Sequence, residues 1–226
     1  MFGGRVMSAK KGSRLSRTTL VFTFVSAALL VFTQPVSAGT RTSTIADPEG
    51  DAFYNLNSNS QLAAPGYQDI LEASVSLRDG RFIFAMGVAA AVPEDPSLPS
   101  GAKLLEWSWR VDTNFAASPS GFPWPPGYAA PAEFMVFALW DGTSFTAILI
   151  DRTPTLTGGQ TIITSVPLKI KGAEITATVD ASRMADPSSF LWFASTQFWT
   201  ADLGTEGFIP LDIALAPGPA WALWPG

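Results

Sequence analysis

The 226-residue chain contains no cysteine and no histidine. Without cysteine it can form no disulfide, no thiolate nucleophile and no cysteine-ligated zinc site. Without histidine it lacks the most frequent general base, the Ser-His-Asp triad and every histidine-based metal site. Carboxylate chemistry and cations held by oxygen ligands are what these two absences leave open.

Acidic residues are absent from the first 38 positions, and this segment has the organisation of an export signal. Its basic residues are Arg5, Lys10, Lys11, Arg14 and Arg17. A 13-residue apolar stretch, Leu20–Phe32, follows, and the small residues Val36-Ser37-Ala38 precede a cleavage point before Gly39. Because a membrane span needs about 20 apolar residues, we predict a cleaved signal peptide over residues 1–38 rather than an anchor. The mature chain is expected to be secreted and to have no membrane span.

Positive charge is scarce in the predicted mature chain. Removal of the signal leaves 188 residues and changes the formal net charge from −5 to −10. Nucleic acids and anionic membranes are bound by basic patches, so neither is an expected partner. A chain of this length fits one domain with a substantial core.

Sustained helical periodicity is also missing, whereas strand signals recur along the mature chain. Apolar residues alternate with other residues around three short turns, which is typical of β-hairpins. The turns are Asp79-Gly80, Asp141-Gly142 and Lys171-Gly172. We predict an antiparallel β-sandwich of about eight to ten strands, immunoglobulin-like or jelly-roll-like, over residues 39–215.

Two of the expected strands differ in whether one face or both faces should be buried. Trp107 and Trp109 alternate with polar residues, which predicts a half-buried strand over Leu105–Val111 with both tryptophans in the core. Glu106 falls on the opposite face of that strand, where solvent is the default environment. Phe190–Phe198 is apolar almost throughout, and we expect a central strand covered on both faces.

The acidic segment Asp47-Pro48-Glu49-Gly50-Asp51 precedes Asp69-Ile70 at the entry to the first strong strand. Three acids within five residues, in a turn shaped by proline and glycine, can direct several oxygens to one point. A hard cation such as Ca²⁺ takes about six to eight oxygen ligands. Asp47, Asp51 and Asp69 are therefore the candidate metal ligands. The alternative is that Asp47 and Asp51 cap turns by accepting hydrogen bonds from nearby backbone N–H groups.

The order of these motifs resembles the DOMON-like and family 9 carbohydrate-binding-module-like domains of secreted bacterial proteins. The resemblance covers roughly residues 44–114 and, more weakly, 190–212. The matching residues are Asp47, Pro48, Gly50, Asp51, Asp69, Ile70, Gly80, Phe84, Met86, Trp109 and Asp112. The resemblance implies a β-sandwich that binds sugars in some members and haem in others, with structural calcium in several. Haem is not expected here, because the chain has no histidine to ligate iron.

Loops supply the candidate ligand-binding aromatics. Three loops are expected from their proline, asparagine and serine content, at Tyr54–Gly66, Pro93–Gly101 and Pro119–Pro131. Trp124 and Tyr128 lie in the last of these loops, which suits either a sugar-binding platform or a plug that closes one end of the sandwich. Trp199 ends a strand, at a position that could reach a site at the rim. The tail Ala216–Gly226 either packs into a groove or stays disordered.

The predicted function is a secreted, non-catalytic binding domain for carbohydrate, with Ca²⁺ as a structural cofactor. The first alternative is a surface structural or protein-interaction domain, with a surface protein as its partner. The second is a carboxylate-dependent glycoside hydrolase, for which Glu106, Asp112 and Glu133 are available. No spacing singles out a pair among these acids, so we predict no catalytic residue.

Overall fold

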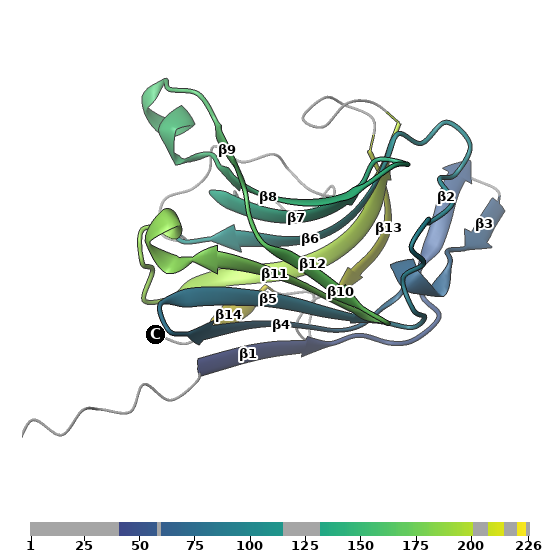
Figure 1. Ribbon diagram of the computed structural model, residues 1–226, viewed down its shortest axis with the longest axis horizontal. Coiled ribbons are helices and arrows are strands. Elements are labelled where there is room, and N and C mark those ends of the chain that lie inside the picture. Colours follow the sequence, from purple (N-terminus) through teal and green to yellow (C-terminus); the bar gives the residue numbers. More distant parts are fainter. Residues whose placement is uncertain (1–40, 58–59, 115–131, 201–207, 215–220, 225–226) are drawn as a thin grey trace, which may run out of the picture. The chain divides into compact units, whose positions relative to one another are not determined.

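The computed structural model describes residues 41–57, 60–114, 132–200, 208–214 and 221–224 (Figure 1). The chain divides into two units, residues 1–37 and 38–226, and the described residues all belong to the second. The predicted signal peptide lies outside the described residues, as do Trp124 and Tyr128. Among the described residues, no helix is long and apolar enough to cross a membrane.

Strands dominate the described residues, and the helical elements are short 3-10 turns. The strands are β1 (Arg41–Ala46), β2 (Phe53–Asn57), β3 (Ser60–Ala63), β4 (Ile70–Arg78), β5 (Arg81–Val88), β6 (Leu104–Asp112), β7 (Phe134–Trp140), β8 (Phe145–Asp151), β9 (Ile162–Ser165), β10 (Leu168–Lys171), β11 (Glu174–Asp180), β12 (Phe190–Trp199), β13 (Phe208–Ala214) and β14 (Ala222–Trp224). The 3-10 turns are η1 (Gly66–Gln68), η2 (Thr153–Thr157) and η3 (Ala181–Met184).

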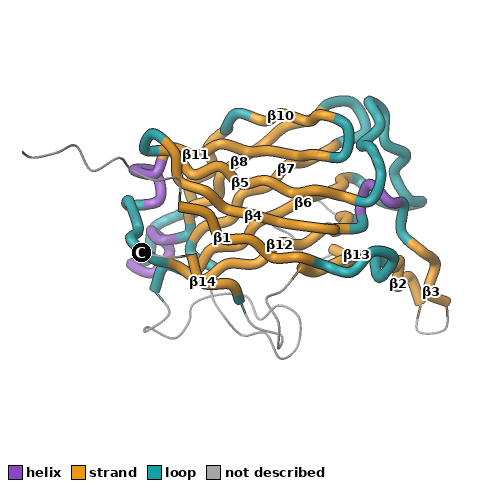
Figure 2. Tube along the Cα trace, turned by 90° about the horizontal axis from the view of Figure 1, so that it is seen from below, coloured by secondary structure: helices purple, strands orange, loops and turns teal. Residues whose placement is uncertain are grey.

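The strands form two antiparallel sheets packed together, which confirms the predicted all-β sandwich. The small sheet has the strand order β1-β4-β5-β11-β10, and Figure 2 shows β1, β4, β5 and β11 side by side. The large sheet has the order β13-β12-β6-β7-β8-β9, with β14 also paired to β12. β9 and β10 follow one another in the chain but belong to different sheets, so the chain crosses between the sheets at this edge (Figure 1). β2 and β3 form a separate hairpin.

The described residues contain fourteen strands, more than the eight to ten predicted. The additional strands include β3, β9 and β14, which are only three or four residues long. A strand of that length carries too few alternations for a period of two to be recognised in the sequence. The longer strands account for the alternation that the sequence shows.

The predicted hairpin turns are all confirmed. Asp79-Gly80 joins β4 to β5, Asp141-Gly142 joins β7 to β8, and Lys171-Gly172 joins β10 to β11. At the second turn, Gly142 has a φ of +87°. Oδ1 of Asp141 accepts hydrogen bonds from the backbone N–H groups of Thr143 and Ser144, both at 2.8 Å. The aspartate therefore binds the free backbone donors, while the glycine takes the left-handed conformation.

The core between the two sheets is rich in aromatic rings. Trp107, Trp109 and Trp192 are fully buried in it, as the sequence predicted. The rings of Phe190 and Trp224 stack with their centroids 5.1 Å apart. Burying a large apolar side chain contributes about 1.5–3 kcal/mol, so packing of this kind can stabilise a chain that has no disulfide.

The large sheet is buried on its second face as well, and this corrects the prediction for Glu106. The Glu106 side chain is 0% exposed rather than solvated, and Ser108 on the same face is also 0% exposed. β6 lies in the interior of the sheet, between β12 and β7. Alternation along β6 therefore separates two buried environments, one apolar and one polar. The prediction that β12 is covered on both faces is confirmed.

Two predicted irregular segments contain regular structure. The expected loop Tyr54–Gly66 includes most of the β2–β3 hairpin, so that prediction was wrong in part. The tail, for which packing and disorder were both open, contributes β14, whose residues Ala222 and Trp224 are buried against the core. The expected loop Pro93–Gly101 contains no strand or helix.

Candidate cation-binding site

A tight turn between β1 and β2 brings two of the predicted metal ligands, Asp47 and Asp51, to the end of the small sheet. The N–H of Asp47 donates to the carbonyl of Leu71 at 2.9 Å, which continues the pairing of β1 with β4 to the start of the turn. Gly50 then reverses the chain with a φ of +86°, a conformation that side chains with a Cβ rarely adopt. Its N–H donates to Oδ2 of Asp69 at 2.8 Å, which fixes the turn against the entry to β4.

Asp212, on β13, is the third carboxylate of the site and comes from the far end of the sequence. Its Oδ2 accepts a hydrogen bond of 2.6 Å from the N–H of Ile70, and its Oδ1 accepts one of 2.8 Å from the N–H of Ile213. The side chain is only 6% exposed. Because Ile70 begins β4 of the small sheet and β13 belongs to the large sheet, this carboxylate links the two sheets.

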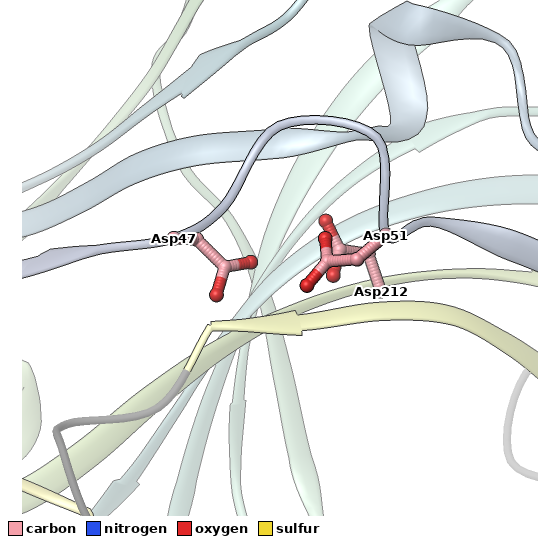
Figure 3. A group of neighbouring side chains, drawn as sticks. All are labelled: Asp47, Asp51 and Asp212. Carbon is pink, nitrogen blue, oxygen red and sulfur yellow. The ribbon is translucent and has the colours of Figure 1, made fainter.

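Asp47, Asp51 and Asp212 form one acidic group. One carboxylate oxygen from each residue lies within 4.8 Å of the corresponding oxygens of the other two. Figure 3 shows the three side chains turned toward a common space between the β1–β2 turn and β13. Asp51 is exposed, Asp47 is half-buried and Asp212 is buried. The space is therefore reachable from solvent on the side of Asp51.

Asp69, the remaining predicted ligand, adjoins this group but is not one of its three members. Its side chain is 5% exposed, and its charge raises the pKa of both Asp47 and Asp51. Its Oδ1 is buried and has no hydrogen-bond partner among the described residues, and the same is true of Oδ2 of Asp47. Buried carboxylate oxygens normally have a hydrogen-bond partner or a cation. Two such oxygens, one within the acidic group and one beside it, therefore indicate a site for a positively charged ligand.

The electrostatics of the group disfavour its fully ionised form. Desolvation, followed by repulsion from Asp212, raises the pKa of Asp47 to about 8. Desolvation also raises the pKa of Asp212, to about 6, against the lowering effect of the hydrogen bond from Ile70. The pKa of Asp51 is raised by desolvation and by the charge of Asp69. Close like charges cannot all ionise without a counter-charge, so the group has to hold protons or a cation.

The donor set of this group suits a hard divalent cation. It offers carboxylate oxygens and no nitrogen or sulfur ligand, since the chain has neither cysteine nor histidine. Ca²⁺ takes about six to eight oxygen ligands at roughly 2.3–2.6 Å and tolerates irregular loops, whereas Mg²⁺ demands near-octahedral geometry. Aspartate oxygens carried by an irregular turn are therefore closer to a calcium site than to a magnesium site.

The sequence prediction missed Asp212. Asp212 is an acid inside the apolar run Phe208–Ala214, where a buried charged side chain needs a partner. That signal was available but does not say which residues the acid meets. Only the topology, which places β13 beside the start of β4, brings Asp212 to the turn that carries Asp47 and Asp51.

A second polar group lies on the buried second face of the large sheet. Oε2 of Glu106 accepts hydrogen bonds from Nε2 of Gln197 at 2.8 Å and from Nε1 of Trp199 at 2.6 Å. Its Oε1 lies 3.5 Å from a guanidinium nitrogen of Arg110. Trp199, a predicted ligand-binding residue, is 6% exposed, and its indole N–H is directed to this carboxylate. A ligand contact at Trp199 stays a prediction.

The two other acids considered for catalysis, Asp112 and Glu133, are neighbours where β6 ends and β7 begins. The pKa of Asp112 is raised to about 6, mainly by desolvation and also by the neighbouring Glu133 carboxyl, against the lowering effect of the hydrogen bond from the N–H of Asn114. Oε2 of Glu133 also accepts from the N–H of Thr113 at 2.8 Å.

Comparisons of the chain with protein families, with curated proteins and with solved structures find no match. What is established is an all-β sandwich with an acidic group where its two sheets meet. The resemblance to DOMON-like and family 9 carbohydrate-binding domains stays a prediction from the sequence.

Proposed function

We propose that this chain is an exported β-sandwich binding domain. Its fold is stabilised by a bound divalent cation, with calcium as the expected ion. The observation that carries the proposal is the acidic group of Asp47, Asp51 and Asp212, with its three oxygens within 4.8 Å of one another. Two buried oxygens without a hydrogen-bond partner among the described residues, on Asp47 within the group and on Asp69 beside it, supply a second reason to expect a positive ligand.

The position of the site explains what a cation would do there. Asp47 and Asp51 hold the turn that follows β1, Asp69 lies at the entry to β4, and Asp212 lies on β13. A cation bound to these carboxylates connects three segments that are far apart in the sequence. Because the unfolded chain does not present the carboxylates together, binding stabilises the folded state by mass action.

Turn capping, the alternative for these residues, accounts for only part of the arrangement. Asp69 does receive a backbone N–H, from Gly50. Oδ2 of Asp47, however, is buried and has no hydrogen-bond partner among the described residues. Capping also gives no reason to gather three acids at one point, where the charge of Asp51 raises the pKa of both Asp47 and Asp212.

Thermal melting of the processed chain, with and without calcium, tests the cation site. Calcium at about 100 times its dissociation constant adds roughly 2.7 kcal/mol to the free energy of unfolding, and excess chelator removes this stabilisation. Asp51→Asn should abolish the calcium effect while leaving the chelated protein at least as stable, since Asp51 is exposed and its charge repels its neighbours. Asp95→Asn is the matched control, because Asp95 is an exposed acid in the loop between β5 and β6. A melting temperature that is unchanged by calcium and chelator overturns the proposal.

We propose carbohydrate as the larger ligand of the domain. Support comes from the sequence resemblance and from the aromatic residues Trp124 and Tyr128, which the sequence places in a proline-rich loop. Exposed aromatic rings stack on the apolar faces of sugars beside groups that bond the sugar hydroxyls.

A panel of polysaccharides and small sugars, measured by melting temperature and calorimetry, tests this ligand class. Binding that is weakened by Trp124→Ala or Tyr128→Ala, with the melting temperature of the free protein unchanged, supports a sugar platform. Loss of stability in those variants, with no sugar bound, favours a structural plug and a surface protein as the partner. Release of reducing sugar from any substrate would establish the hydrolase alternative instead.

A further inference from the structure

The arm formed by residues 153–165, which comprises η2 and β9, carries an unusual concentration of exposed apolar side chains. The described residues include four exposed large hydrophobic side chains, and three of these lie in the arm: Leu156, Ile162 and Ile163, at 51%, 52% and 60% exposure. In Figure 1 the arm lies at the end of the large sheet, beyond β8. Exposed apolar groups that gather in one place commonly mark an interaction site.

The arm is internally ordered, so its exposed groups are held in position. The hydroxyls of Thr155 and Thr157 donate to the carbonyls of Arg152 and Pro154, at 2.7 and 3.1 Å. Gly158 ends η2 with a φ of +81°, and its N–H donates to the carbonyl of Thr155. A partner that binds here would not have to order this turn, which lowers the entropic cost of association.

β9 is the last strand of the large sheet and pairs only with β8 among the described residues. One row of its backbone N–H and C=O groups therefore has no strand beside it. Natural proteins usually protect such an edge with proline or with charged side chains, especially lysine. No charged residue occurs between Arg152 and Lys169, and β9 itself has the β-prone sequence Ile-Ile-Thr-Ser.

The two isoleucines of β9 define what kind of partner fits. They are adjacent in the strand, so their side chains point to opposite faces of the sheet, and both are more than half exposed. A surface that docked onto one face would cover only one of them. A strand that adds to the edge covers both, provided that it carries apolar side chains on both of its faces.

Register shows that an apolar row of the sheet ends uncovered at this edge. Ile163 is paired with Ile150, and Ile150 is paired in turn with Met135. Ile150 is 6% exposed and belongs to the small apolar cluster on the second face of the large sheet. Ile163 continues this row and is 60% exposed.

We propose that β9 is the docking edge for a second copy of this chain, paired antiparallel about a two-fold axis with Ile163 opposite Ile163 of the second copy. The second copy supplies what the edge requires, a neutral strand with isoleucine on both faces. The uncharged arm is also where two chains of net negative charge approach with least repulsion. The paired segments are short, so the dimer belongs to the weak, transient class of interfaces. This proposal does not depend on the cation or the sugar.

Sedimentation equilibrium of the processed chain, from about 5 to 500 μM, tests the proposal. We expect a dimer that forms with increasing concentration, and Ile163→Lys should weaken the association constant by at least about tenfold, which corresponds to about 1.4 kcal/mol. Leu223→Lys is the matched control, because Leu223 is 58% exposed but lies on β14. Circular dichroism of both variants establishes that they fold.

A second measurement needs no variant. Hydrogen exchange of the amides of residues 162–165 should slow as the protein concentration rises, while exchange in the β2–β3 hairpin should not change. A monomer at every concentration overturns the proposal. So does a dimer that Ile163→Lys leaves intact, since its interface would then lie elsewhere. Binding of the arm to phosphatidylcholine vesicles by a chain that stays monomeric would also overturn it, in favour of a lipid surface.

Discussion

The N–H of Ile70 donates to Oδ2 of Asp212 at 2.6 Å. This hydrogen bond joins the first residue of β4, in the small sheet, to β13, in the large sheet. The same carboxylate belongs to the acidic group with Asp47 and Asp51. The junction between the two sheets and the candidate cation site are therefore built on one side chain, and a change at the site is expected to affect the stability of the whole fold.

The buried carboxylate of Glu106 is expected to be important for stability. Glu106→Gln removes the charge that balances Arg110 and presents an amide N–H₂ to groups that are themselves donors, Gln197 and Trp199. Breaking a buried ion pair from one side costs about 3–5 kcal/mol. We expect a loss of about 3 kcal/mol in the free energy of unfolding, measured with urea. Glu94→Gln, at an exposed loop position, should change it by less than about 0.5 kcal/mol. Equal effects of the two changes would show that the Glu106 network is not stabilising.

The carboxyl pair of Asp112 and Glu133 should make stability depend on pH. The pKa of Asp112 is raised to about 6 from 3.8, so the folded state binds a proton more tightly than the unfolded state. The stabilisation is complete below pH 3.8 and is lost as the pH rises through 6. Asp112→Asn, which cannot ionise, should therefore be more stable than the wild type at pH 8, by on the order of 1 kcal/mol. At pH 4 the two should be alike in thermal melts, and a destabilised variant at pH 8 would contradict the assignment.

The turn aspartate Asp141 has the opposite dependence on pH. Its hydrogen bonds from Thr143 and Ser144 lower its pKa to about 2. The stabilisation is present above pH 3.8 and is lost as the pH falls toward 2. Asp141→Ala should reduce the free energy of unfolding at pH 7 by about 1 kcal/mol, through the loss of these hydrogen bonds. Asp141→Asn keeps the acceptor oxygen and should cost less. If the alanine and asparagine variants unfold at the same denaturant concentration, the carboxamide does not replace the carboxylate as acceptor.

Local signals in the sequence were sufficient for much of the fold. Asp-Gly and Lys-Gly turns between alternating segments specified three hairpins, because both the turn geometry and the strand period are encoded within a few residues. The environment of Glu106 could not be predicted in this way. Alternation shows that neighbouring side chains of a strand face opposite ways, but it does not show whether the second face is covered. Burial of that face depends on residues distant in the sequence.

The candidate cation site was also predictable only in the part that is encoded by neighbouring residues. Asp47 and Asp51 were recognised because proline and glycine shape the turn that holds them together. Asp69 was recognised from its place before the first strong strand, and it adjoins the group as the buried partner of Gly50. Asp212 could not be joined to the others, since its proximity depends on the order of strands in two sheets. Local sequence patterns do not determine the order of strands in a sheet.

Isothermal titration calorimetry of calcium into chelator-treated protein tests the central claim most directly. Asp47, with a pKa of about 8, is mostly protonated at pH 7, so a cation bound there has to displace its proton. We predict one calcium site, an affinity that rises from pH 6 to pH 8, and heats at pH 7 that differ between two buffers of unlike ionisation enthalpy by the release of about one proton. Asp51→Asn should lose the site, and Asp95→Asn should keep it. An absence of calcium binding, or binding that Asp51→Asn leaves unchanged, would contradict the assignment of a cation to this acidic group.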